Sequence, residues 1–162
     1  MSIVPAEDLA KCKGPLSRLT LEYSYIMKDL VKRAKNPAFT PADWAPLAEL
    51  VAVDEWERTG NFRETIKWDQ YDDLLTIWGR NTVWDFTVRR VTEGDGYAIL
   101  ELEERAGYPD RDETYCSVSV YEFNAANKLR HLEIYLSKAE PESSSMSHQW
   151  DLTEVEAAIL PS

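Results

Sequence analysis

Residues 120–135 read VYEFNAANKLRHLEIY, two alternating runs separated by a short polar segment. Aromatic and β-branched residues at every second position are typical of strands that bury one face. The polar segment, Asn124 to Lys128, includes Asn127, a residue type that tolerates a positive φ in turns. The stretch therefore predicts an antiparallel β-hairpin.

The turn length sets which residues of this hairpin share a face. A five-residue turn places Phe123 opposite Arg130 and Tyr121 opposite Leu132, and opposed residues lie on the same side of the sheet. One face then carries Ser117, Ser119, Tyr121, Leu132, Ile134 and Leu136, and the other carries Val118, Val120, His131, Glu133 and Tyr135.

The rest of the chain divides at Gly79. After it, runs at 83–91, 97–105, 113–123 and 129–136 alternate with short turn-rich connections, which predicts an antiparallel meander. Before it, apolar residues recur at three- and four-residue steps. This pattern predicts helices at 15–36, at 40–50 and from a capping box at 61–64 to Gly79, with a short extended segment at 53–56. Three helices followed by a curled antiparallel sheet make an α+β fold.

Length and composition limit the possibilities further. The 162 residues are typical of one domain, which we expect at 15–138, after an arm at 1–14 and before a linker and short helix at 139–162. The net charge of −11 repels nucleic acid and anionic membranes, so neither is expected as a partner. No uncharged run approaches a membrane span and no signal sequence is recognisable, and the two isolated cysteines fit a reduced compartment. We therefore expect a cytoplasmic protein.

The order of elements and the final hairpin resemble the cone-shaped fold shared by nuclear transport factor 2, ketosteroid isomerase and SnoaL-like polyketide cyclases. The hairpin is similar to the family's phenylalanine, polar turn ending in Gly-Lys or Gly-Arg, and strand ending near a tyrosine, although Asn127 replaces the glycine. The resemblance implies three helices in the concave face of the sheet and a ligand cavity inside the cone. This fold hosts isomerases, cyclases, dehydratases and other lyases, and also non-catalytic modules.

The resemblance also implies a general base on the short strand before the third helix, where this chain reads Val53-Asp54-Glu55-Trp56. Glu55 takes that role, with Asp54 as the alternative because a one-residue slip exchanges the faces of a strand. An apolar cone would raise the pKa of such a carboxylate toward the range useful for proton transfer. The competing interpretation is that both acids lie on the solvated side of an edge strand.

Hydrogen-bond donors are implied at two further positions. Tyr23 lies in the apolar stripe of the first helix, whereas Tyr25 falls on its charged side. Ser119 corresponds to the family's second donor, an acid, and a serine cannot serve as a protonated carboxylic acid, which argues against steroid isomerisation itself. The expected walls of the cavity are Trp56, Trp84, Phe86, Tyr121, Leu132 and Ile134.

Two function classes follow. The first is a small cofactor-free isomerase, cyclase or dehydratase acting on a hydrophobic carbonyl-bearing molecule, with no metal, because the acids Asp69, Asp72 and Asp73 fit a solvated helix face. The alternative is a non-catalytic ligand-binding or protein-interaction module of the same fold. In either case the apolar outer face of the hairpin predicts a homodimer.

Overall fold

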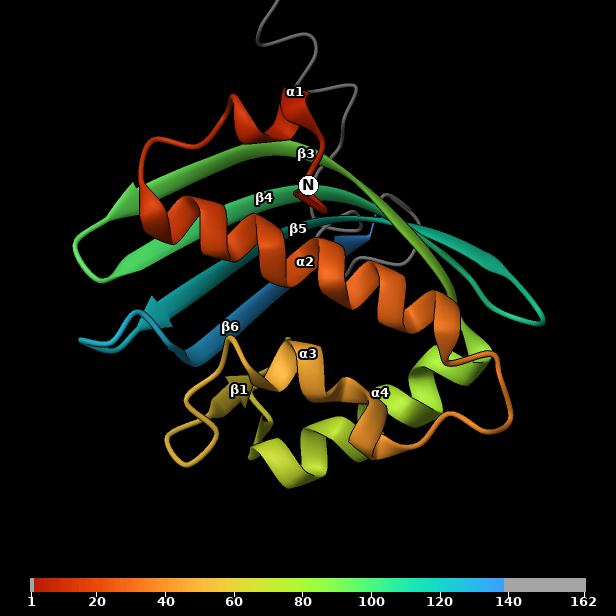
Figure 1. The fold of residues 1–162 in the computed structure, drawn as a ribbon. Helices are drawn as coiled ribbons and strands as arrows, with labels where there is room; N and C mark the ends of the chain where they lie inside the picture. Colours follow the sequence, from red (N-terminus) through yellow and green to blue (C-terminus); the bar gives the residue numbers. More distant parts are fainter. Residues whose placement is uncertain (1, 139–162) are drawn as a thin grey trace, which may run out of the picture.

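A six-stranded sheet curls around one long helix in the computed structural model, which describes residues 2–138 (Figure 1). The helices are α1 (Ala6–Leu9), α2 (Pro15–Arg33), the 3₁₀ helix η1 (Pro41–Trp44), α3 (Ala45–Ala48) and α4 (Trp68–Asn81). The strands are β1 (Glu57–Thr59), β2 (Thr65–Ile66), β3 (Val83–Gly94), β4 (Tyr97–Gly107), β5 (Asp112–Phe123) and β6 (Leu129–Lys138). The α+β fold is confirmed, and the linker and helix expected at 139–162 lie outside the described residues.

The sheet has the order β2-β1-β6-β5-β4-β3. Strands β3 to β6 form the predicted antiparallel meander, and β1 adds to it in parallel beside β6. Helix α2 runs across the concave face, and α3 and α4 lie below it in this view (Figure 1). None of the described helices is both long and apolar enough to cross a membrane.

Helix α2 is anchored at its start by the sheet. Pro15 occupies the first turn, and Glu93 at the end of β3 accepts hydrogen bonds from both the backbone N–H and the hydroxyl of Ser17 at 2.8 Å. A carboxylate at a helix N-terminus satisfies free N–H groups and favours the helix dipole. Residues of the apolar stripe predicted for this helix are buried against the sheet, including Leu16, Met27 and Leu30.

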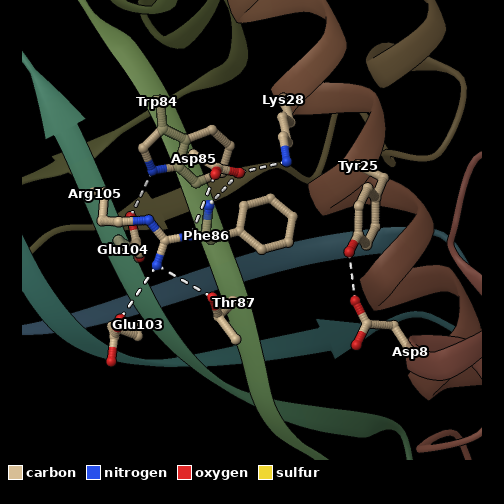
Figure 2. A network of polar contacts seen from close by, with 10 residues as sticks. All are labelled: Asp8, Tyr25, Lys28, Trp84, Asp85, Phe86, Thr87, Glu103, Glu104 and Arg105. Atoms are coloured by element: carbon tan, nitrogen blue, oxygen red, sulfur yellow. Dashed lines mark hydrogen bonds and ion pairs between the residues drawn. The ribbon is translucent and has the colours of Figure 1, made fainter.

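The N-terminal arm packs on the same helix. Asp8 of α1 is buried and accepts hydrogen bonds from the Tyr25 hydroxyl and from Lys11 at 2.5 Å. Figure 2 shows the Tyr25–Asp8 hydrogen bond and the ion pair that joins Lys28 of α2 to Asp85 of β3. The charged side of α2 is therefore tied to α1 and to β3.

The register of the final hairpin is confirmed for Tyr121 opposite Leu132 and for Ser119 opposite Ile134. It is wrong at the turn, because Phe123 faces Leu129 and Arg130 is the extra residue of a bulge. The turn closes through the Asn124 N–H to the Lys128 carbonyl at 2.9 Å, which brings Leu129 directly opposite Phe123.

The region before α4 also differs from expectation. Residues 53–55 form a turn instead of a strand, and β1 begins at Glu57. The predicted capping box at 61–64 does not start the helix, which begins at Trp68. Instead, residues 60–64 turn between β1 and β2, closed by the Gly60 N–H to the Glu64 carbonyl at 2.8 Å with Arg63 at a φ of 65°.

Candidate functional site

A cavity of about 240 Å³ lies between α2, α4 and the inner face of the sheet. Its walls are mainly aromatic and aliphatic, and Leu74 and Leu136 are exposed at its edge, which places the opening there. The lining residues are Tyr23, Ser24, Met27, Arg58, Tyr71, Leu74, Leu75, Trp78, Trp84, Leu102, Glu104, Ala106, Tyr108, Tyr115, Ser119, Tyr121, Leu132, Ile134 and Leu136.

Glu104 is the one acid among these lining residues. It occupies β4 at a position in phase with Leu100 and Leu102, whose side chains are buried, so its carboxylate projects inward. Trp84 Nε1 of β3 donates a hydrogen bond to Glu104 Oε2 at 2.8 Å, and Ser117 Oγ of β5 donates to Oε1 at 2.5 Å. Figure 2 shows the Trp84 contact. Two neighbouring strands thus hold this carboxylate in a fixed orientation.

A buried group of aromatic rings borders the cavity. Trp56 stacks on Tyr71 with ring centroids 5.3 Å apart and on Tyr23 at 6.4 Å, and Tyr121 meets Tyr23 edge to face at 5.8 Å. Offset and edge-to-face pairs are the favoured arrangements of aromatic rings. This packing positions three phenol hydroxyls at the cavity.

The three hydroxyls differ in whether their proton is already used in a hydrogen bond. Tyr23 donates to the Tyr71 oxygen at 3.3 Å, so the proton of Tyr71 itself is uncommitted. Ser24 donates to the Thr20 carbonyl at 3.0 Å, so in its 3.4 Å contact with Tyr121 the single tyrosine proton is the donor. Of these three, Tyr71 is therefore the phenol with a proton free to donate into the cavity.

Burial keeps these phenols protonated. It raises the pKa of Tyr23, Tyr71 and Tyr121 above the usual value because the phenolate would lose its hydration. The nearby Arg58 charge opposes the shift at Tyr23 and Tyr71 without reversing it. Near neutral pH these three residues carry hydroxyl groups and no phenolate.

Arg58 brings a positive charge to the lining. It lies in the middle of β1 beside Leu132 of β6, and both side chains reach the cavity. Its guanidinium carbon lies 5.7 Å from the centroid of the Tyr71 ring, and Nη1 lies 3.5 Å from Glu64 Oε1. The site therefore combines one carboxylate, one guanidinium and neutral hydroxyl donors.

The structure brings together six of the residues expected from the sequence. Of the expected donors, Tyr23 and Ser119 line the cavity, and of the expected walls, Trp84, Tyr121, Leu132 and Ile134 do. Trp56 and Phe86 are outside the lining, because both are buried in aromatic packing behind it. Tyr25 lies elsewhere, against Phe86 and Asp8.

The expectation that Glu55 or Asp54 faces the cavity is wrong. Both are exposed, since the segment is a turn and not a strand. Glu55 accepts a hydrogen bond from the turn residue Asn124, Nδ2 to Oε1 at 3.1 Å. The next residue, Trp56, is the one that enters the core.

Sequence reasoning missed Glu104, Tyr71 and Arg58. A signal for Glu104 was available, because it interrupts the apolar phase of β4 formed by Ala98, Leu100 and Leu102. Arg58 had no such signal, since its strand has only three residues. Among the described residues no group of three or more His, Cys, Asp or Glu side chains is placed to hold a metal ion.

Comparison with known proteins gives matches only at the level of structure. No family model matches the sequence, and no curated protein matches it. A putative SnoaL-like polyketide cyclase from Shewanella putrefaciens CN-32 superposes with a TM-score of 0.59 at 10% identity, covering 90% of this chain and 99% of that one.

Two further solved structures are similar. An NTF2-like protein from Burkholderia xenovorans LB400 gives a TM-score of 0.55 at 18% identity, covering 85% of this chain and 96% of that one. An epoxide hydrolase of the LEH-like type from M. tuberculosis gives 0.52 at 10% identity, covering 82% and 96%. Identities this low define the fold and leave the reaction open. The chain thus has the NTF2-like fold shared by these SnoaL-like and related proteins.

Proposed function

We propose that this protein is a cofactor-free acid–base enzyme, an isomerase, cyclase or dehydratase, in which Glu104 moves a proton on a small carbonyl compound. The observation that carries the proposal is the Glu104 carboxylate, held by Trp84 and Ser117 on the wall of a mainly apolar cavity. Similar folds described as polyketide cyclases and an epoxide hydrolase support a catalytic use of such a cavity.

The chemistry requires an acceptor for a proton and donors for an oxygen. Each Glu104 oxygen accepts one hydrogen bond and keeps a further lone pair, so the carboxylate can take a proton from a carbon beside a carbonyl. Donors from Tyr71 and Ser119 would stabilise the enolate oxygen that forms. Returning the proton to another carbon completes an isomerisation, and loss of a β-hydroxyl with that proton completes a dehydration.

The cavity restricts the substrate. Its volume of about 240 Å³ is below the range of roughly 300–1,000 Å³ typical of drug-sized ligand pockets. Leu102, Leu132 and Ile134 line it with aliphatic surface. A compound about the size of one substituted six-membered ring, with a single reacting carbonyl, fits this space better than a multi-ring steroid.

The test compares two glutamates. Cyclohex-3-en-1-one is converted by proton transfer to its conjugated isomer, which is followed by ultraviolet absorbance, and exchange of its α-protons in D₂O is followed by NMR. Glu104→Gln should lower either rate by about 10²- to 10⁴-fold, because it removes the proton acceptor and keeps the shape. Glu55→Gln, the matched control in the exposed turn, should keep the wild-type rate.

Equal rates for Glu104→Gln and the wild-type protein would contradict the proposal. A protein that binds such ketones without turnover or exchange would support the alternative, a non-catalytic binding module. One observation favours that alternative: both Glu104 oxygens and the Tyr23 and Tyr121 protons already have partners inside the protein.

For the assembly we propose a homodimer through the outer face of β5 and β6. Val118 and Tyr135 on this face are 42% and 47% exposed, a large apolar exposure for a sheet. The wild-type protein should sediment as a dimer at micromolar concentration, and Val118→Asp should sediment as a monomer. A wild-type monomer under these conditions would exclude the dimer.

A further inference from the structure

Arg58 is the one cation among the lining residues, and the proton transfer proposed above does not use it. Its side chain is only 17% exposed. Its Nε has no hydrogen-bond partner among residues 2–138 and no exposed surface. Because Nε itself is enclosed, an acceptor brought by a ligand would meet the guanidinium at its Nη groups, at the end of the side chain.

The protein neutralises Arg58 only in part. Glu64, the acid nearest to it, approaches Nη1 at 3.5 Å and is 44% exposed, so water screens the pair. The guanidinium carbon lies over the Tyr71 ring, 5.7 Å from its centroid, and the Tyr71 hydroxyl has its proton free. The arrangement leaves positive charge directed at the cavity.

The geometry of the guanidinium favours one class of ligand. Its two Nη groups carry N–H bonds that point in parallel, and this pair matches the two oxygens of a carboxylate. A neutral carbonyl would use one of the two donors and leave the charge uncompensated. A carboxylate would satisfy both.

Glu104 does not occupy this position. Strands β6 and β5 lie between β1 and β4, so Arg58 and Glu104 are separated by three strand spacings, about 14 Å along the curled sheet. A ligand carboxylate at Arg58 would therefore be well removed from the Glu104 charge.

We propose that the ligand of this cavity is a small apolar carboxylate, bound through its carboxylate by Arg58, with its apolar part on Leu132 and Ile134. If the proposed function holds, the substrate is an apolar oxo acid. Arg58 recognises its carboxylate, and its carbonyl lies toward Glu104. Arg58 is a binding residue in this scheme and takes no part in proton transfer.

The experiment measures binding, which needs no turnover. Cyclohexanecarboxylate and cyclohexanecarboxamide form a matched pair, and benzoate and benzamide form a second; each is titrated by calorimetry. The wild-type protein should bind each carboxylate at least 10-fold more tightly than its amide. Arg58→Gln should abolish this preference and leave the amide affinity within two-fold of wild type.

Arg63→Gln is the control, since Arg63 is an exposed arginine of the neighbouring turn that pairs with Glu133 outside the cavity. It should keep the full preference. Arg58→Lys keeps the charge without the parallel donors and should keep only part of the preference, which provides a second test if Arg58→Gln does not fold.

Four results would overturn the inference: no binding of either carboxylate, equal affinity for carboxylate and amide, an undiminished preference in Arg58→Gln or in Arg58→Lys, or inorganic phosphate binding as tightly as the carboxylates. Glu104→Gln separates the two proposals. It should lose turnover and keep the carboxylate preference. In the wild-type protein, absent turnover with an intact carboxylate preference would refute the proposed enzyme alone, and turnover without that preference would refute the carboxylate site alone.

Discussion

Glu55 and Glu104 are glutamates in contrasting settings. Glu55 lies in an exposed turn and bonds to the side chain of Asn124, whereas Glu104 lies on the inner face of β4 and is bonded by Trp84 and Ser117. Its position in the chain, just before the third helix, favoured Glu55 as the general base. The inward-facing side of the sheet favours Glu104 for that role. The direction of a side chain, more than its place in the order of elements, decides whether an acid reaches the cavity.

The turn has a physical origin. The Ala52 N–H donates to the Leu129 carbonyl, and the Leu129 N–H donates to the Leu50 carbonyl, both at 2.9 Å, so the chain is fastened to the start of β6 before it reaches the acids. The Glu55 N–H then bonds back to the Ala52 carbonyl at 2.9 Å, which closes the turn. Its polar residues remain in water, and Trp56 enters the core.

The largest difference in stability is expected between a substitution in the core and one in the turn beside it. Trp56 is fully buried against Tyr23, Trp68 and Tyr71, so Trp56→Ala should lower the free energy of unfolding by about 3–5 kcal/mol. Val53→Ala, in the exposed turn, should change it by less than about 0.5 kcal/mol. Urea unfolding followed by circular dichroism measures both, and similar losses would show that the turn is packed as tightly as the core.

An intermediate effect is expected from removing each glutamate. Glu104→Ala leaves the Trp84 N–H and the Ser117 hydroxyl without their acceptor and should cost about 1–3 kcal/mol of unfolding free energy. Glu55→Ala removes an exposed contact and should cost less than about 0.5 kcal/mol. Urea unfolding of the two variants at pH 7 checks this contrast, which would fail if Glu104→Ala were as stable as wild type.

The smallest expected effect is the pH dependence of stability that comes from Tyr121, one of the buried tyrosines at the cavity. Burial raises the pKa of Tyr121 in the folded state, whereas an unfolded tyrosine ionises near about 10. The unfolded chain therefore loses this proton first, and stability falls as the pH rises above 10. Relative to Tyr121→Phe, wild type should lose about 1.4 kcal/mol of unfolding free energy by one pH unit above that value.

Urea unfolding at pH 8, 10 and 11 measures this difference, with the gap at pH 8 as the internal reference. At pH 8 the two proteins should differ only through the lost Tyr121–Ser24 contact. A constant gap across the series would mean that the Tyr121 hydroxyl ionises as readily in the folded protein as in the unfolded one.

Much of the fold could be predicted from local patterns. Alternation with a period of two defined the four strands of the meander, and the hairpin register placed Ser119, Tyr121, Leu132 and Ile134 on one face, which is the face that lines the cavity. Helical periodicity placed Tyr23 inward and Tyr25 elsewhere. These features follow from the sequence because the direction of a side chain in a regular element depends on its position in the repeat.

The site itself depended on contacts between distant segments. The Glu104 carboxylate is oriented by side chains 20 and 13 residues away on two other strands, and Arg58 reaches the cavity because a three-residue strand adds to the edge of β6. A strand this short has too few residues for a repeat to be recognised. The turn at 53–55 depends on hydrogen bonds to Leu129, a partner far along the chain. Only the packed sheet brings the carboxylate, the guanidinium and the free Tyr71 hydroxyl to one cavity, since each is oriented by neighbours that are remote in sequence.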